Sequence, residues 1–444
     1  MLFLMTVALT MTILVATRTW NPWPQARTEI VQWWENFTAL SDPDPKWSVR
    51  IGGAPDIAAV MTTGHVVVHT RGFLTGHDPA DGRVTWDEEV QWALPAYDVV
   101  VARLRPANPD AVAAPTSGFV VLDPSDGGVL WADDAAQAVW AFADAIVDLT
   151  CDDGGGCRLR ARNHQTDSER WSLTVPGEVR PIRGPNPALA GTRDPAEWFA
   201  EAAAGTPDPV PDLFGLEVDG RVYIVDTFRP EYIREVVPPN GQTRVAVAND
   251  RYLYVQARPG PAGCVYRVEA FNYQTAAPEW SRDGYSLDTA SGAGCEQRRQ
   301  PLGRDGQLVV NTSDGHPRLV LAQQRDDSVP KWVGESGEHI LAVDSELAVI
   351  LGADRQTLRL VDLQRAERPT IWTYKTGFDP EAALIGERLI IRDADKATLL
   401  VVSRTGTVTH LRVSTKSSII GYGPTGLILA SGRKVGLHPF GPVT

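Results

Sequence analysis

The chain has 444 residues, of which 43% are hydrophobic and 22% are charged, and its formal net charge is −13. This composition is typical of a folded globular protein rather than a disordered one. The negative charge, together with the lack of any local run of lysine or arginine, excludes a nucleic-acid-binding function, because phosphate recognition needs a basic surface.

The first 17 residues, MLFLMTVALTMTILVAT, carry no charged side chain. A helix continued from here through Arg18 to Trp20 and Trp23 is long enough for a hydrocarbon core of roughly 30 Å, with its tryptophans at the interface. Residues 1–23 are therefore predicted to be a transmembrane anchor or uncleaved signal segment, with a cleaved signal peptide as the alternative. The rest of the chain is expected on the extracytoplasmic side of the cell membrane, or secreted after cleavage.

Residues 24–44 are predicted to form an amphipathic linker helix. After Pro24, large apolar residues recur at steps of three and four positions: Ile30, Trp33, Trp34, Phe37 and Leu40. The polar side of this helix carries only Arg27 as a cation, so docking against the folded domain is favoured over a position on the membrane surface.

A repeat begins after this linker. GHDPADGRVTW holds Asp78, Gly82 and Trp86 at intervals of four residues, and VLDPSDGGVLW repeats the frame. In this second copy the three residues are Asp123, Gly127 and Trp131. Degraded copies follow, with the polar residue and the Trp eight to ten positions apart: Asn163 and Trp171, Asn272 and Trp280, Gln324 and Trp332, and Asp362 and Trp372. The last copy keeps Gly406 and has His410 in the Trp position.

The frame predicts a hairpin between two strands. The Asp or Asn side chain caps the turn, Gly adopts a positive φ, and Trp opens the next strand, where its ring covers the gap between neighbouring sheets. Apolar alternating runs precede each frame, and the Trp residues recur about every 40 to 50 residues, which is the length of one four-stranded propeller blade.

This pattern resembles the repeat of quinoprotein-type (PQQ-like) β-propellers over about residues 45–440. That family includes pyrroloquinoline-quinone dehydrogenases and cofactor-free scaffolds such as the lipoprotein of the bacterial outer-membrane assembly machine. The chain is most similar to the non-enzymatic branch, as a membrane-anchored member of actinobacterial type. The resemblance implies an all-β propeller of four-stranded blades over residues 45–444. Eight blades are expected, with seven or nine left open.

The ring is expected to close through the two ends of the propeller. KWSV (46–49) reads as an outermost strand with no blade before it, and the strands near 426–440 read as inner strands with no outer strand after them. The interval from Trp171 to Trp280 is expected to hide a repeat without Trp at 221–237. One insertion, 194–205, has the capping signals of a short helix that either packs on the rim or binds a partner.

The four cysteines fall into two local pairs behind the export segment, which predicts disulfides Cys151–Cys157 and Cys264–Cys295. A zinc site is the alternative, but five residues separate the first pair and no His is adjacent.

No catalytic, cofactor-binding or metal-binding residues are predicted. By the family pattern, quinoprotein enzymes use a disulfide of adjacent cysteines, an Asp base and a Ca²⁺ site, and the chain has neither adjacent cysteines nor a calcium-loop motif. The sequence therefore predicts a membrane-tethered scaffold, not an enzyme, that binds an unknown protein or cell-envelope component and no cofactor. The alternative is a PQQ-dependent oxidoreductase with a divergent site.

Overall fold

The computed structural model describes residues 41–440, apart from the segments 52–56, 106–117, 183–209, 288–305 and 324–329 and shorter gaps of one to four residues. Within these bounds every regular element is a β-strand. The strands form where β-branched and other apolar residues recur, as in β4 (Val66–Thr70, VVVHT) and β26 (Leu347–Leu351, LAVIL).

The first sheet has seven strands in the order β3 to β9. It divides at β6 (Val84–Ala96), whose first half pairs with β5 and whose second half pairs with β7, with a shift in register between Val90 and Trp92. This strand is thus the outermost strand of one four-stranded unit and the innermost strand of the next. The remaining strands are β3 (Ala58–Met61), β5 (Phe73–His77), β7 (Val99–Leu104), β8 (Phe119–Leu122) and β9 (Val129–Asp133).

Five sheets of consecutive antiparallel strands follow. Four have four strands, and the sheet of β22 to β24 has three, with an isolated bridge between Ser286 and Asn311 at its inner edge. Their strands are β10 (Ala138–Ala141), β11 (Ile146–Cys151), β12 (Cys157–Arg162), β13 (Glu169–Val175); β14 (Val179–Ile182), β15 (Leu213–Val218), β16 (Arg221–Asp226), β17 (Ile233–Val236); β18 (Thr243–Ala248), β19 (Arg251–Gly260), β20 (Gly263–Asn272), β21 (Pro278–Asp283); β22 (Gln307–Asn311), β23 (Pro317–Leu321), β24 (Trp332–Val333); β25 (His339–Val343), β26, β27 (Thr357–Asp362) and β28 (Thr370–Lys375).

The last two sheets each take an outer strand from the N-terminal end of the described chain. The strand β1 (Ser41–Asp42) pairs with β32, and β2 (Trp47–Arg50) pairs with β35. The other strands are β29 (Glu381–Ile385), β30 (Arg388–Asp393), β31 (Thr398–Ser403), β32 (Val408–Val413), β33 (Ser418–Gly423), β34 (Gly426–Ser431) and β35 (Lys434–Pro439).

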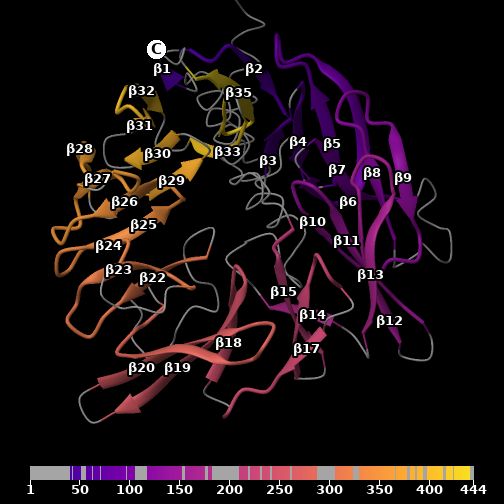
Figure 1. Cartoon of the computed structure of the whole chain (residues 1–444). Coiled ribbons are helices and arrows are strands. Elements are labelled where there is room, and N and C mark those ends of the chain that lie inside the picture. Colours follow the sequence, from indigo (N-terminus) through magenta and orange to yellow (C-terminus); the bar gives the residue numbers. More distant parts are fainter. Residues whose placement is uncertain are drawn as a thin grey trace, which may run out of the picture.

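We number the units as blades in chain order. Blade 1 is β3 to β6 and blade 2 is β6 to β9; blades 3 to 7 are the five sheets from β10 to β28; blade 8 is β29 to β32 with β1; and blade 9 is β33 to β35 with β2. Counted over the described strands, the chain has nine such units rather than the expected eight, which is the upper of the counts left open by the sequence. Figure 1 shows them following one another around the molecule, until the yellow strands return beside β2.

Hydrophobic clusters join each blade to the next. The contact between blades 9 and 1 is one of them, with Trp47, Ile420 and Leu437 packed against Ala59 and Val66. Comparable clusters link blades 1 and 2, blades 2 to 4, blades 4 and 5, and every later pair through to blades 8 and 9. The ring is therefore closed by apolar packing on all sides.

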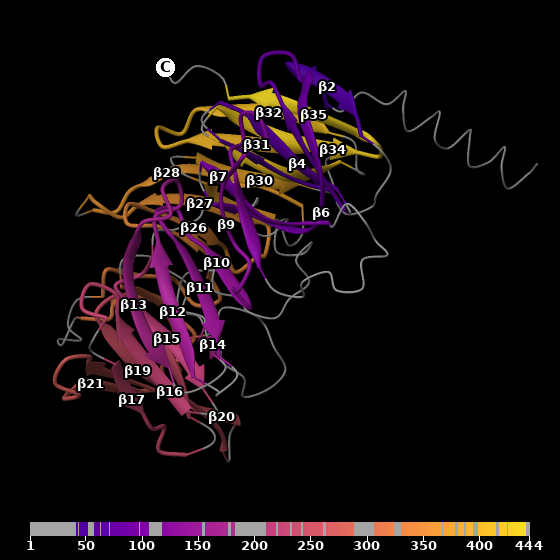
Figure 2. The ribbon, with the colours of Figure 1, turned by 90° about the vertical axis from the view of Figure 1, so that its right-hand side faces the viewer.

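The predicted pairing of the two ends is confirmed. Trp47 lies opposite Leu437 and Arg50 lies opposite Lys434 in an antiparallel pair. Figures 1 and 2 both place β2 beside β35. This pairing covers an edge that β35 would otherwise expose.

Three predictions concern residues outside the described part of the chain. These are the anchor or signal at 1–23, most of the linker helix at 24–44, and the helix at 194–205. The linker prediction was wrong at its end, because Ser41 and Asp42 pair with Arg412 and Val413 as a strand. Among the described residues, no helix is long and apolar enough to cross a membrane.

Candidate functional site

The repeat frame has the predicted hairpin geometry. In blade 1, the Asp78 carboxylate accepts a hydrogen bond from the Ala80 amide at 2.7 Å, and Gly82 donates to the Asp78 carbonyl at 2.8 Å with a φ of 76°. Asp123 and Gly127 repeat these contacts in blade 2. Hydrogen bonds from the Ser125 side chain and amide lower the pKa of Asp123. The frame aspartates are thus turn caps.

The Trp of each full frame reaches the next blade. Its indole Nε1 donates to the carbonyl that follows the frame residue of that blade, as from Trp86 to Pro124 at 2.8 Å and from Trp131 to His164 at 2.9 Å. Trp47 makes the same contact with Pro79 at 3.0 Å across the closure. The ring also covers the glycine of the neighbouring turn, since a Cβ on Gly127 would lie 2.8 Å from the Trp86 ring.

Two of the degraded frames keep the turn without glycine. Asp167 and Ala276 take the positive φ, at 58° and 56°, in the turns capped by Asn163 and Asn272. The prediction that His410 fills the Trp position was wrong. His410 is exposed, whereas Leu411 is buried in the cluster between blades 8 and 9. Side chains alternate along a strand, so a shift of one residue exchanges the two faces.

Blade 4 holds the expected repeat without Trp. Asp226 caps its turn by accepting from the Phe228 amide at 3.0 Å, and Arg234 stands eight residues later, where the full frames have Trp. The Arg234 guanidinium donates to the Gln274 carbonyl of blade 5 at 2.5 Å, and it lies over the Tyr273 ring at 6.0 Å. An arginine therefore replaces the indole donor at this contact.

Tyr273 packs between blades 4 and 5 from the blade-5 side. It is buried, and its hydroxyl donates to the Ile224 carbonyl of blade 4 at 3.4 Å. Burial is the largest cause that raises its pKa above the ordinary value. The spacing of eight residues from Asp226 could have identified Arg234 from the sequence, but a search for Trp does not detect it.

The outer part of blade 4 exposes three large apolar side chains, which we call the blade-4 rim: Phe228, Ile233 and Val237. Phe228 is 78% exposed, Val237 is 70% and Ile233 is 37%. Phe228 and Val237 are the two most exposed large apolar residues in the described chain. They stand in the turn before β17 and directly after β17.

The other repeats serve as internal controls for these positions. Two residues after the frame Asp or Asn, where blade 4 has Phe228, the other frames carry small or polar residues: Ala80, Ser125, Gln165, Gln274 and Gln364. Eleven residues after it, where blade 4 has Val237, four frames carry charged or polar residues: Glu89, Asp134, Thr174 and Asp283. The turn and the strand therefore fold without apolar residues at these positions.

A buried ionic cluster lies between blades 2 and 3. The Arg160 guanidinium contacts Asp133 and Asp148 at 2.6 Å each, and Arg162 contacts Asp148 at 2.9 Å as well as Asp133. Arg162 also lies over the Trp131 ring at 5.3 Å. Asp148 is fully buried, and the two arginines compensate the charges of the two carboxylates.

The pKa values of the two carboxylates in this cluster shift in opposite directions, although burial acts to raise both. It raises the pKa of Asp148, and the nearby arginines do not overcome this effect. It also acts to raise the pKa of Asp133, but the Ala135 amide and the Arg162 guanidinium outweigh it and lower that pKa. Because Asp148 is out of reach of solvent, we assign the cluster to the packing of blades 2 and 3.

Two histidines have contacts that assign them to packing between blades. His77 is buried and stacks on Trp47, with ring centroids 6.2 Å apart, and its Nδ1 lies 3.0 Å from the Gly82 carbonyl. His164 lies 2.6 Å from Asp98 and links blades 3 and 2. In the described part of the chain, no three His, Cys, Asp or Glu side chains come together as a metal site.

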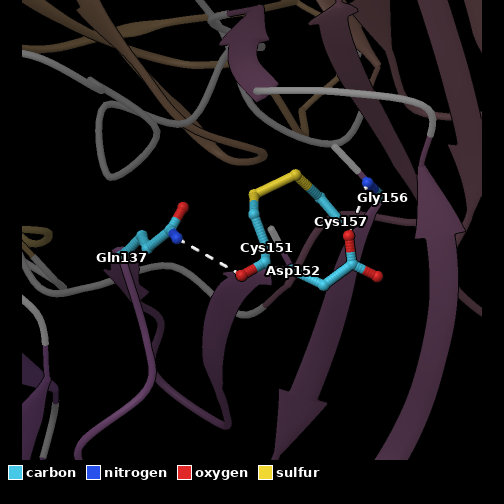
Figure 3. The surroundings of a disulfide bond; sticks show 5 residues. All are labelled: Gln137, Cys151, Asp152, Gly156 and Cys157. Carbon is cyan, nitrogen blue, oxygen red and sulfur yellow. Dashed lines mark hydrogen bonds between the residues drawn. A yellow bond between two sulfur atoms is a disulfide. The ribbon is translucent and has the colours of Figure 1, made fainter. Parts of the chain in front are cut away.

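The predicted disulfide between Cys151 and Cys157 is confirmed, and it joins the facing ends of β11 and β12. Figure 3 shows its surroundings: the Gln137 amide donates to the Cys151 carbonyl at 3.4 Å, and the Asp152 carboxylate accepts from the Gly156 amide at 2.9 Å. Cys264 is also disulfide-bonded, but its predicted partner Cys295 lies outside the described residues, so that pairing stays a prediction.

Eight antiparallel sheets, which divide into nine successive blades, close into a ring, with Trp contacts from several blades to the next. The fold is a β-propeller. Similar solved structures include BamB from Moraxella catarrhalis, at 12% identity over 88% of this chain and 98% of that chain, with a TM-score of 0.37. The Dos1 propeller is 9% identical over 92% and 97% of the two chains, with a TM-score of 0.38. These likenesses concern the fold alone.

A third solved structure, a eukaryotic initiation factor, is 8% identical over 89% of this chain and 93% of that chain, with a TM-score of 0.48. No protein-family model matches the chain, and no curated protein sequence matches it.

Proposed function

We propose that this propeller is a binding scaffold, tethered by residues 1–23 to the outside of the cell membrane, that engages a protein or envelope component. The observation that carries the proposal is the blade-4 rim. Phe228, at 78% exposure, and Val237, at 70%, stand where the other repeats are small or polar. Exposed aromatic and aliphatic side chains on a rigid support are typical anchors of protein interfaces.

The support of these anchors is rigid. Asp226 fixes the turn before β17 by accepting hydrogen bonds from the Phe228 and Arg229 amides, at 3.0 and 3.1 Å. The Arg234 contact with Gln274 holds β17 against blade 5. A rigid anchor loses little conformational entropy when it is buried by a partner.

The location is proposed from the cysteines. Disulfides persist mainly in oxidising compartments, so the Cys151–Cys157 bridge supports an extracytoplasmic propeller. We also propose that the protein is not a quinone-dependent enzyme, since its cysteines are not adjacent and its frame aspartates are engaged as turn caps.

The test is affinity capture with the full anchored chain in its native membrane, after chemical cross-linking. We expect a partner that is recovered with the wild type and lost with the double variant Phe228→Ser, Val237→Thr. The matched control is Val84→Ser, Val129→Ser, which removes two side chains that are 49% and 52% exposed on blades 1 and 2. Equal recovery by the two double variants would contradict a function of the rim.

A further inference from the structure

Building on the proposed function, we propose that the blade-4 rim takes an extended, apolar and uncharged segment of a partner protein, which adds to β17 as a new outer strand. Strand addition to an open sheet edge is a recurrent mode of peptide recognition, in which main-chain hydrogen bonds give affinity and alternate side chains give specificity.

The position of β17 supplies the edge. It is the outermost strand of the order β14-β15-β16-β17, and no described strand pairs with its other side. Phe228 precedes the strand and Val237 follows it, so large apolar side chains flank the open edge at both ends. Four residues of strand span about 13 Å, so an added segment of six to eight residues would reach both anchors.

The propeller already accepts strands in this way. β1 adds to β32 as a fifth strand at the outer edge of blade 8. The added segment is antiparallel to β32, the outer strand of the four consecutive strands of blade 8. The outer edge of blade 8 therefore accepts an added strand, which sets the precedent for the equivalent edge of blade 4.

The charges of the rim define the partner. Arg221 pairs with Glu235 at 3.4 Å, and Arg229 pairs with Asp226 at 3.3 Å, so the ions at this edge compensate one another. An apolar, uncharged segment is complementary to such an edge, whereas an acidic segment, or a second copy of this chain, would meet the repulsion of a protein with net charge −13.

The experiment measures binding of synthetic ten-residue peptides to the purified full chain by fluorescence anisotropy. The first peptide alternates valine and threonine, the second has proline at two central positions, and the third has glutamate in place of threonine. We expect the first peptide to bind at least tenfold more tightly than either of the others, because proline removes main-chain donors and glutamate adds like charge.

Two variants and one structural readout complete the test. Phe228→Ser and Val237→Thr should each weaken binding of the first peptide at least tenfold, while Val129→Ser leaves it unchanged. Bound peptide should slow hydrogen exchange in β17. Equal binding of the proline peptide, or binding unaffected by Phe228→Ser, would overturn strand addition. If the membrane experiment still captured a partner through Phe228, the proposed scaffold function would be supported and only strand addition would be wrong.

Discussion

Gly127 shows how a single residue joins two blades. It combines a φ of 74° with direct contact to the Trp86 ring of the preceding blade. An L side chain at this position is strained by the backbone and also displaces the indole. Glycine at this position therefore meets two demands, the positive φ of the turn and the close approach of the neighbouring ring.

We expect Gly127→Ala to lower the free energy of unfolding by about 1 kcal/mol or more, because alanine disfavours positive φ and its Cβ meets the Trp86 ring. Gly64→Ala is the matched control, since a Cβ there has no atom within 4 Å and the backbone is not in the positive-φ region. Urea denaturation of both variants measures the difference, and equal midpoints would contradict this account of the frame.

Buried histidines predict a loss of stability in mild acid. Burial lowers the pKa of His438 from 6.5 to about 4, and burial also lowers the pKa of His77. As the pH falls below 6.5, the unfolded chain binds protons that the folded chain excludes, so unfolding becomes more favourable until the pH reaches the folded pKa. For His438 this loss amounts to about 3 kcal/mol between pH 6.5 and 4.

Urea denaturation at pH 7, 6, 5 and 4 tests this prediction. We expect the pH dependence to be shallower in His438→Gln than in the wild type. The exposed residue His410 provides the control His410→Gln, which should keep the wild-type slope. If His438→Gln showed the same pH dependence of stability as the wild type, His438 would not be the cause of the acid sensitivity.

At the scale of elements, hairpins with full frames could be predicted from the sequence because each frame residue has one physical role. The side chains of Asp78 and Asp123 cap the hairpin turn, and Gly82 and Gly127 adopt its positive φ. The tryptophans donate hydrogen bonds to the next blade. The strand β6 could not be predicted in this way, because its 13 residues serve two blades and no turn residue marks the boundary. The apolar rim was also missed, since exposure depends on the register of β17.

We expect the disulfide at the end of the β11–β12 hairpin to contribute measurably to the free energy of unfolding. Cys151 and Cys157 enclose a loop with a sequence separation of 6. Loop-closure entropy for so short a loop gives about 2 kcal/mol. We expect the double variant Cys151→Ser, Cys157→Ser to have a free energy of unfolding that is lower by this amount, and therefore a lower urea midpoint. Wild-type protein treated with a reductant is no substitute, because Cys264 is also disulfide-bonded. An unchanged midpoint would show that the bridge does not restrain the unfolded chain.

At the scale of the whole molecule, closure was predictable and the number of blades was not. One end of the chain has an outer strand without a blade, and the other end has inner strands without an outer strand. Their edges are covered only if they pair, and β2 does pair with β35. The number of blades depends on the small angle between successive sheets, which no local frame encodes. Family resemblance therefore favoured eight, whereas the described sheets divide into nine.

Because Trp47 takes part in ring closure, we expect Trp47→Ala to destabilise the protein strongly. Trp47 is buried, donates to the Pro79 carbonyl and stacks on His77. Its truncation should lower the free energy of unfolding by about 3 to 5 kcal/mol. In contrast, Ser41→Pro affects only β1, which adds to the outside of blade 8 and takes no part in closure. Thermal melting should therefore fall strongly in the first variant and little in the second; comparable losses would contradict the assignment of closure to β2.

The two N-terminal strands also determine how the ring carries mechanical load. The register pairs two residues of β1 with β32 and four residues of β2 with β35. A force that pulls on the chain ahead of Ser41 acts on β1 before it acts on β2. We expect the shorter pairing to detach first, so that moderate tension releases β1 while the pairing of β2 with β35 keeps the propeller closed.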